Sequence, residues 1–146
     1  MSKYIHKRHN VSKLLYHFVC PVKYRRIVIT DKIDKTLKEL CIEISKRYEM
    51  NFVEIGADND HVHFLIQSVP NISASKIIMI VKSIIAKEIF QCHPEIMESL
   101  WGGSFWTAGF FVNTVGASGN EEVIRNYVKG PGLDYKKIYR DQMKLF

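Results

Sequence analysis

The stretch "NFVEIGADNDHVHFLIQ", residues 51–67, decides the fold because it predicts a β-hairpin near the middle of the chain. Its two arms, 51–57 and 61–67, contain the β-branched and aromatic residues that are typical of strands. The polar "DND" between the arms is typical of a turn. A strand and a helix are predicted before this hairpin, and a helix and a strand after it.

Before the hairpin, "KLLYHFVC" (13–20) predicts a strand, and Pro21 fits the end of that strand. A helix follows, and Asp31 is expected to cap its N-terminus. The apolar positions of this helix recur at helical spacing, and they are Ile33, Leu37, Leu40, Cys41, Ile44 and Tyr48.

After the hairpin, a long helix is predicted over 73–90, and "SFWTAGFFVN" (104–113) predicts a fourth strand. The apolar stripe of the long helix consists of Ile77, Ile78, Val81, Ile84, Ile85 and Ile89. Ser118 and Glu121 have the spacing of a capping box, which predicts a last helix over 120–129. The order β-α-β-β-α-β plus a C-terminal helix predicts an α+β fold of the ferredoxin-like or RRM-like kind, with an antiparallel sheet and helices on one face.

The length of 146 residues predicts one domain spanning 1–146, and no linker or repeat interrupts the chain. The hydrophobic fraction of 47% is ample for a core. The longest purely aliphatic run, 77–81, is far too short to cross a bilayer, so no membrane association is expected. The three cysteines are far apart and have no Cys-x-x-Cys spacing, which argues against disulfides and a structural zinc site. A cytoplasmic location is therefore expected.

Positive charge is concentrated at the start of the chain. Residues 1–30 contain seven lysines and arginines and no acidic residue, which gives +7 against +6 for the whole chain. Aromatic residues are interleaved with these cations, a combination that suits nucleic acid with stackable bases. On the helix predicted over 73–90, Lys76, Ser83 and Lys87 line the polar face, either as phosphate contacts or as a solvated surface.

His61 and His63 are predicted on one face of the second hairpin strand, roughly 6.5–7 Å apart at Cα, so both rings could reach one ion. The alternative is two half-exposed histidines that bond to their surroundings. Leu65 stands where a histidine-triad hydrolase would have a third histidine, and a zinc hydrolase would need a third protein ligand. Asp58 and Asp60 are near, but Asp is also common in turns. The pair therefore predicts an incomplete metal site that awaits another ligand.

Tyr127 lies on the apolar side of the predicted last helix, with Val123, Ile124 and Val128. A buried core tyrosine is the ordinary interpretation of such a position. The alternative is a nucleophile toward a phosphodiester, provided that a metal polarises the phosphate.

Four stretches together carry a family resemblance: "YHFVCPVKYRR" (16–26), "DHVHFLI" (60–66), "FWTAGFFVNTVG" (105–116) and "VIRNYVK" (123–129). In this order and spacing they resemble the small, TnpA-like HUH-type tyrosine transposases of single-strand, peel-and-paste insertion sequences. The resemblance covers nearly the whole chain, from about residue 16 to residue 140.

The resemblance implies a homodimer, with sheets joined edge to edge, that binds hairpins in single-stranded DNA near the ends of the element. It implies that His61 and His63 bind a divalent metal, Mg²⁺ or the Mn²⁺ that imidazole suits better. It also implies that Tyr127 forms a 5′-phosphotyrosine link and releases a 3′-hydroxyl. The helix from about residue 119 can be exchanged within such a dimer. The expected DNA contacts are Lys23, Arg25, Arg26, Lys76 and Lys87.

One position departs from the family pattern. Relatives usually carry a metal-binding glutamine four residues after the tyrosine, whereas this chain has Pro131, which offers no ligand and tends to end a helix. The third ligand then comes from water, from an Asp or from the substrate. The alternative function is a non-catalytic single-stranded nucleic-acid-binding protein, decayed or domesticated. An open sheet edge beside the first strand is a further reason to expect a dimer.

Overall fold

The structure, a computed structural model, describes residues 4–100, 103–115, 125 and 128. Its strands are β1 (Ile5–His6), β2 (Val11–Ser12), β3 (Leu14–Pro21), β4 (Asn51–Asp58), β5 (His61–Ser68) and β6 (Phe111–Val115). Its helices are the 3₁₀ turn η1 (Lys23–Arg25), α1 (Asp31–Arg47), α2 (Ala74–Cys92) and the short α3 (Ile96–Ser99).

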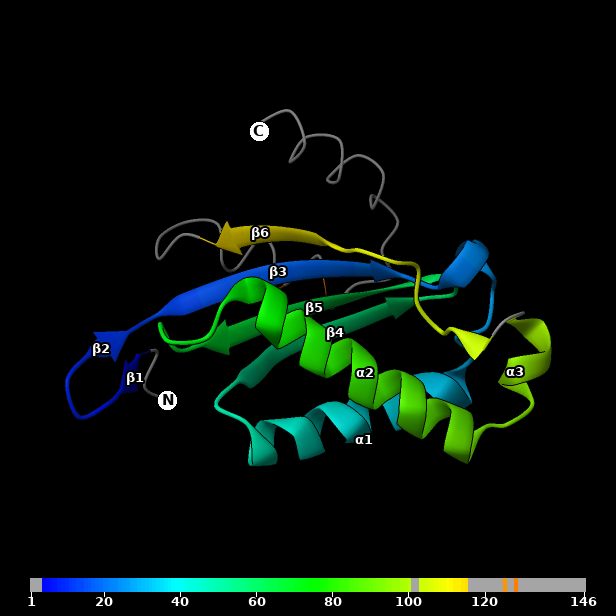
Figure 1. Ribbon diagram of the computed structural model, residues 1–146, viewed down its shortest axis with the longest axis horizontal. Helices are drawn as coiled ribbons and strands as arrows, with labels where there is room; N and C mark the ends of the chain where they lie inside the picture. Colours follow the sequence, from blue (N-terminus) through cyan, green and yellow to red (C-terminus); the bar gives the residue numbers. More distant parts are fainter. Residues whose placement is uncertain (1–3, 101–102, 116–124, 126–127, 129–146) are drawn as a thin grey trace.

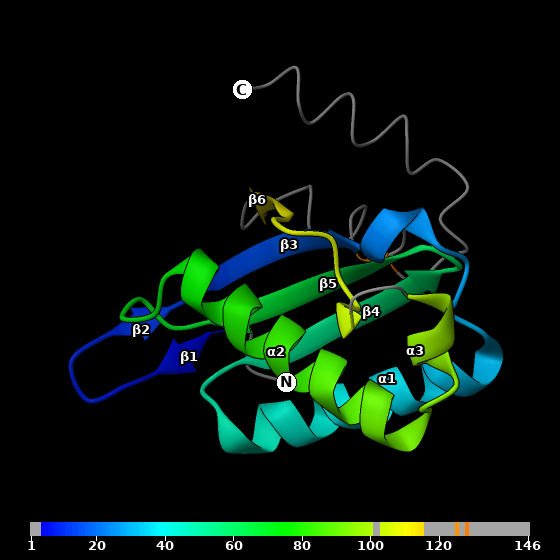
Figure 2. The same ribbon diagram turned by 45° about the vertical axis from the view of Figure 1, so that its right-hand side comes forward.

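The main sheet has the strand order β4-β5-β3-β6, and every neighbouring pair is antiparallel. Helices α1 and α2 lie side by side against one face of this sheet, as Figures 1 and 2 show. The ferredoxin-like α+β prediction is confirmed for the described residues. Of the predicted C-terminal helix, only residues 125 and 128 are described.

The pleat of β5 separates two environments. Val62, Phe64 and Ile66 are fully buried in the core beneath α1 and α2, together with Phe18 of β3. Because successive side chains alternate, His61, His63 and Leu65 face the other side of the sheet. There Leu65 packs with Leu15 and Val115 in a second, smaller cluster. The hydrophobic alternation of β5 thus assigns both histidines to the face without α1 and α2.

The fourth predicted strand begins later than expected. It starts at residue 111 rather than 104, because Lys82 of α2 binds the backbone before it: its Nζ donates to the carbonyl oxygens of Thr107 at 3.0 Å and Gly109 at 2.6 Å. In return, the Trp106 indole donates to the carbonyl of Lys82 at 3.0 Å. Within 104–110 the only ladder contact in the described structure is an isolated bridge from Trp106 to Val22.

Two further expectations are corrected. Thr30, rather than Asp31, caps α1, since its hydroxyl oxygen accepts the N–H of Ile33 at 3.4 Å. The first predicted strand, β3, is not at the sheet edge, because β6 pairs with it; β4 and β6 are the edges of the main sheet as described. The β1–β2 hairpin and α3 were not predicted from the sequence. Among the described residues, no helix is long and apolar enough to cross a membrane.

Candidate functional site

The turn before β5 is held by the chain that leaves β3. The N–H of Val22 donates to the carbonyl of Asp60 at 2.8 Å, and the N–H groups of Val28 and Ile29 donate to the carbonyl of Asn59 at 3.1 Å. Pro21 stands opposite His61 in the β3–β5 register. The backbone that presents His61 is therefore fixed from both strands.

His61 and His63 lie together on the sheet face opposite α1 and α2, with ring centroids 5.0 Å apart. Each side chain is only 3% exposed, so the alternative of two half-exposed histidines is wrong. The prediction that the two imidazoles share one face is confirmed. Their role as metal ligands stays a prediction.

A third histidine, His17 of β3, completes this cluster, and it was missed from the sequence. Its Nε2 lies 2.9 Å from Nδ1 of His63, and the two rings stack with centroids 5.2 Å apart and planes 9° from parallel. His17 is fully buried. In the β3–β5 register, Val19 stands opposite His63 and His17 opposite Leu65, so His17 lies on the histidine face. The sequence signal for His17 was a histidine within a predicted strand.

Burial keeps two of these rings neutral. It lowers the pKa of His17 to about 4, and it lowers the pKa of His63 to about 2, with the charges of His17 and His61 acting in the same direction. A neutral imidazole is the form that binds a metal. Because Nδ1 of His63 is engaged by His17, Nε2 is the ring nitrogen of His63 that suits an ion.

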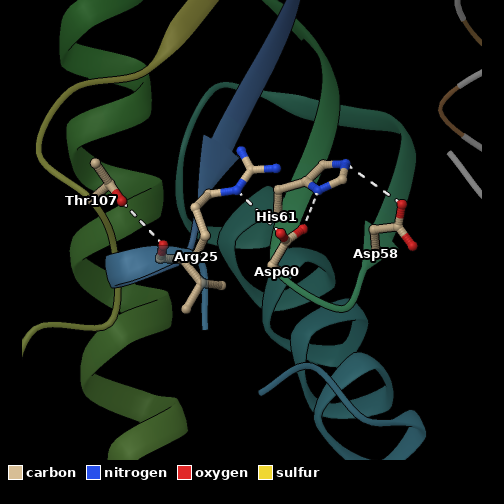
Figure 3. A network of polar contacts seen from close by, with 6 residues as sticks. Arg25, Asp58, Asp60, His61 and Thr107 are labelled. Carbon is tan, nitrogen blue, oxygen red and sulfur yellow. Dashed lines mark hydrogen bonds and ion pairs between the residues drawn. The ribbon is translucent and has the colours of Figure 1, made fainter. Parts of the chain in front are cut away.

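The neighbouring ring, His61, is flanked by two carboxylates. Its Nδ1 lies 2.7 Å from Oδ1 of Asp60, whose Oδ2 accepts a hydrogen bond from Nε of Arg25 at 3.1 Å (Figure 3). On the other side of the ring, Nε2 lies 3.8 Å from Oδ2 of Asp58. Burial raises the pKa of Asp60, but the hydrogen bond from His61 and the Arg25 guanidinium outweigh it, and the net pKa is below its usual value.

Such a carboxylate behind a histidine is the usual support of a metal-binding imidazole. Two imidazoles with a carboxylate beside them suit Mn²⁺ better than Mg²⁺, because Mg²⁺ prefers oxygen ligands. Among the described residues, no group of three His, Cys, Asp or Glu side chains is arranged to hold an ion. The incomplete metal site at His61 and His63 stays a prediction.

The η1 turn at the end of β3 has an uncommon backbone. Tyr24 and Arg25 have φ angles of 58° and 53°, in the left-handed region that glycine favours. Each such residue costs of the order of 1–3 kcal/mol, and the conformation persists only where neighbours enforce it. Here the N–H of Lys23 donates to Phe105 and the N–H of Arg25 to Val22, both at 2.8 Å. The Tyr24 ring is 64% exposed, a position that suits stacking on a base.

The predicted DNA contacts fall on two sides of the molecule. Lys23, Arg25 and Arg26 lie at the end of β3, where Arg25 reaches the turn before His61. Lys76 and Lys87 are exposed on α2, in the layer on the opposite side of the sheet from the histidines. The structure does not bring these two sets together.

Tyr127 lies outside the described residues, but residues on either side of it in the sequence contact β4. Nε of Arg125 lies 2.9 Å from Oε1 of Glu54, and the carbonyl oxygen of Val128 lies so close to Gly56 that a Cβ there would overlap it. Gly56 pairs with His63 and Glu54 with Leu65, so both contacts are on the histidine face.

Comparisons with known proteins show what the chain is similar to. The family model described as "Transposase IS200 like" matches residues 10–131. The ISDra2 transposase TnpA of Deinococcus radiodurans is 27% identical over 119 residues, which cover 82% of this chain and 84% of that protein. The transposase for insertion sequence element IS200 of Salmonella typhimurium is 24% identical, over 78% of this chain and 74% of that protein.

Two solved structures are also similar. The crystal structure of a candidate transposase from Deinococcus radiodurans R1 superposes with a TM-score of 0.71 at 26% identity, covering 87% of this chain and 97% of that one. A REP-associated tyrosine transposase bound to a REP hairpin gives a TM-score of 0.54 at 14% identity, covering 88% of this chain and 68% of that one. The second likeness concerns the fold alone.

Proposed function

Because the chain belongs to the IS200-like transposase family, we propose that it is a metal-dependent strand transferase that cuts and joins single-stranded DNA at the ends of an insertion sequence. The observation that supports this proposal most directly is the buried pair His61 and His63, backed by Asp60 and His17. A sheet face that only bound nucleic acid would not need buried imidazoles with their Nδ1 atoms engaged.

His61 and His63 would hold the ion, Mg²⁺ or Mn²⁺, through their Nε2 atoms. When bound, such an ion polarises the scissile phosphate and offsets the charge that develops on it. The third protein ligand is open, because Pro131 stands where relatives have glutamine. Asp58 is the carboxylate that the described structure places nearest to Nε2 of His61, at 3.8 Å, and it is our candidate for that ligand.

Tyr127 would be the nucleophile. Its phenol loses a proton, its oxygen forms a bond to the scissile phosphorus, and the bond from phosphorus to the 3′ oxygen breaks. The products are a 5′-phosphotyrosine and a DNA strand with a free 3′-hydroxyl, which takes up a proton. In the joining step a 3′-hydroxyl attacks the phosphotyrosine and releases the phenol. The contacts of Arg125 and Val128 on the histidine face of β4 support this assignment.

The substrate would be single-stranded DNA marked by a hairpin; the structural neighbour is bound to a REP hairpin. The basic turn at 23–26 adjoins the histidine site and exposes the Tyr24 ring, so it suits a strand that leads to the scissile phosphate. A homodimer joined through a sheet edge would use β4 or β6.

A second function has one observation in its favour. With Pro131 in place of the glutamine, the chain could bind single-stranded DNA without cutting it. This alternative keeps the basic turn and the aromatic side chains but makes no use of Tyr127.

A covalent-adduct assay separates the two functions. The protein is incubated with a hairpin-bearing single-stranded end oligonucleotide and Mn²⁺ or Mg²⁺, and a shifted protein–DNA band is sought on a denaturing gel. We expect an adduct that Tyr127→Phe and the double variant His61→Ala, His63→Ala abolish and that the control Tyr135→Phe retains. Oligonucleotide binding without an adduct in the wild type, with either metal, would favour the non-catalytic function. An adduct that survives in Tyr127→Phe would assign the nucleophile to another residue.

A further inference from the structure

We propose that Arg25 is a positioning residue for the metal ligand His61, acting through Asp60, rather than the DNA phosphate contact predicted from its place in "KYRR". This inference rests on the proposed function, since it names a residue that prepares the same site. It is carried by the chain of contacts from Arg25 to Asp60 and from Asp60 to His61 (Figure 3).

The two oxygens of Asp60 serve different partners. Oδ2 accepts from Nε of Arg25 at 3.1 Å, and Oδ1 lies 2.7 Å from Nδ1 of His61. An ionised carboxylate only accepts hydrogen bonds, so Nδ1 of His61 must carry the proton. In the neutral ring Nε2 then has the lone pair, and this is the nitrogen on the side of Asp58. The contact therefore selects the ring tautomer that can bind a metal through Nε2.

The backbone of Arg25 is held so that its side chain reaches Asp60. Arg25 and the residue before it have left-handed φ angles. The turn is fixed by the Arg25 N–H bond to Val22, and Val22 in turn donates its N–H to the carbonyl of Asp60 at 2.8 Å. The hydroxyl of Thr107 also donates to the Val22 carbonyl, at 3.1 Å. Arginine and aspartate are thus tied together by the main chain as well as by their side chains.

The next residue offers a contrast. Arg26 has an ordinary extended backbone, with φ of −69° and ψ of 141°, and it is exposed. A flexible arginine on such a backbone suits a phosphate contact and needs no special turn. The two adjacent arginines are therefore assigned different tasks, Arg25 to the site and Arg26 to the DNA.

The test compares Arg25→Gln with Arg26→Gln, two variants that each remove one positive charge from neighbouring positions. The first readout is the tautomer of His61 in the metal-free protein, from long-range ¹H–¹⁵N correlation of its ring nitrogens. The second is the Kd for Mn²⁺, titrated without DNA. Removing a nearby positive charge should by itself strengthen Mn²⁺ binding. Losing the support of His61 should weaken it, so the two effects differ in sign.

We expect the wild type and Arg26→Gln to show a single His61 tautomer with the proton on Nδ1, and to bind Mn²⁺ within about twofold of each other. Arg25→Gln and Asp60→Asn should show mixed tautomers and bind Mn²⁺ about 10-fold more weakly or worse. Should Arg25→Gln fail to fold, Arg25→Lys tests the same link, because it keeps the charge but removes the Nε donor that bonds Oδ2 of Asp60, and it should give the same mixed tautomers. The proposal would be overturned if the His61 tautomer in Arg25→Gln were that of the wild type, or if Arg25→Gln bound Mn²⁺ as tightly as Arg26→Gln. Arg25 would then be interpreted as a DNA contact, as the sequence predicted.

Failure of the proposed function gives a different result. If Arg25→Gln binds Mn²⁺ more weakly than Arg26→Gln but the wild type forms no adduct, the protein is not catalytic. The inference that Arg25 positions His61 then still holds. If the wild type does not bind Mn²⁺, the metal site fails, while the tautomer comparison still decides whether Arg25 orients His61.

Discussion

Gly56→Ala is expected to reduce strand cleavage by about 100-fold or more while leaving the sheet folded. Gly56 stands opposite His63, and the carbonyl oxygen of Val128 occupies the space that a Cβ on Gly56 would need. The two atoms must separate to ordinary van der Waals contact of about 3.5 Å, which requires a shift on the order of 2 Å. A 1 Å misplacement of reacting groups costs about 100-fold in rate.

The effect of Gly56→Ala on the free energy of unfolding has opposing contributions. Alanine in a strand interior is favoured over glycine by roughly 0.5–1 kcal/mol. Displacing the segment at 128 weakens the exposed ion pair of Arg125 with Glu54, which is worth no more than about 1 kcal/mol. Val128 is also only 1% exposed, so displacing it loses part of the roughly 1.5–3 kcal/mol that burial of a valine contributes. The free energy of unfolding should therefore fall by no more than about 3 kcal/mol.

The assay is the single-turnover rate of adduct formation on an end oligonucleotide, with urea unfolding and oligonucleotide affinity measured on the same preparation. Asn51→Ala is the matched control, since Asn51 is an exposed position at the start of the same strand. Loss of cleavage in a protein that stays folded under the assay conditions and keeps its DNA affinity would support the reasoning. A Gly56→Ala protein that cleaves at the wild-type rate would show that Val128 does not lie against Gly56 during catalysis. The argument that this contact positions the nucleophile would then be wrong.

Three further predictions test the packing, the buried histidines and the assembly. Lys82→Met should lower the free energy of unfolding by about 2 kcal/mol, because the carbonyls of Thr107 and Gly109 lose a charged donor. Lys87 is exposed, so Lys87→Met should change the free energy of unfolding little, and equal urea midpoints for the two variants would contradict the prediction. In the metal-free protein, burial lowers the pKa of His17 from 6.5 in the unfolded chain to about 4 in the folded one. The unfolded state therefore binds the proton first as the pH is lowered, and the free energy of unfolding should fall by about 3 kcal/mol between pH 6.5 and about pH 4. This loss of stability in acid should be smaller in His17→Leu, and identical pH slopes in the two proteins would refute the prediction. Light scattering should give twice the mass of one chain at working concentrations, and a mass of one chain would exclude the expected homodimer.

The sequence predicted the histidine pair because a strand has a period of two, and this period is visible without knowing the partners of the strand. The alternation of Val62 and Phe64 with His61 and His63 was enough to place both rings on one face. His17 escaped prediction because its role depends on the register between β3 and β5, which places it diagonally across from His63. Register is a property of two segments about 46 residues apart, and the local pattern of either one does not encode it.

The fourth strand illustrates the same limit from another direction. The aromatic and β-branched composition of 104–113 correctly indicated extended chain, yet the strand begins at residue 111. The difference arises from two sets of hydrogen bonds between side chain and main chain. Lys82 donates to the carbonyls of Thr107 and Gly109, and the Trp106 indole donates to the carbonyl of Lys82. Propensity reports what a segment favours alone, and here a lysine from another element decides where the ladder begins.

The division of the predicted cations between two layers bears on how DNA can approach the site. The histidines face away from α1 and α2, so a strand that reaches them must lie on that face or at its end, where Lys23 and Arg26 are found. Lys76 and Lys87 are exposed on the far side of the sheet, on α2. One strand segment therefore cannot touch both sets while lying flat on the histidine face. If Lys76 and Lys87 contact DNA at all, they contact a part of it that has passed around the end of the sheet, such as the stem of a hairpin whose flanking single strand enters the site.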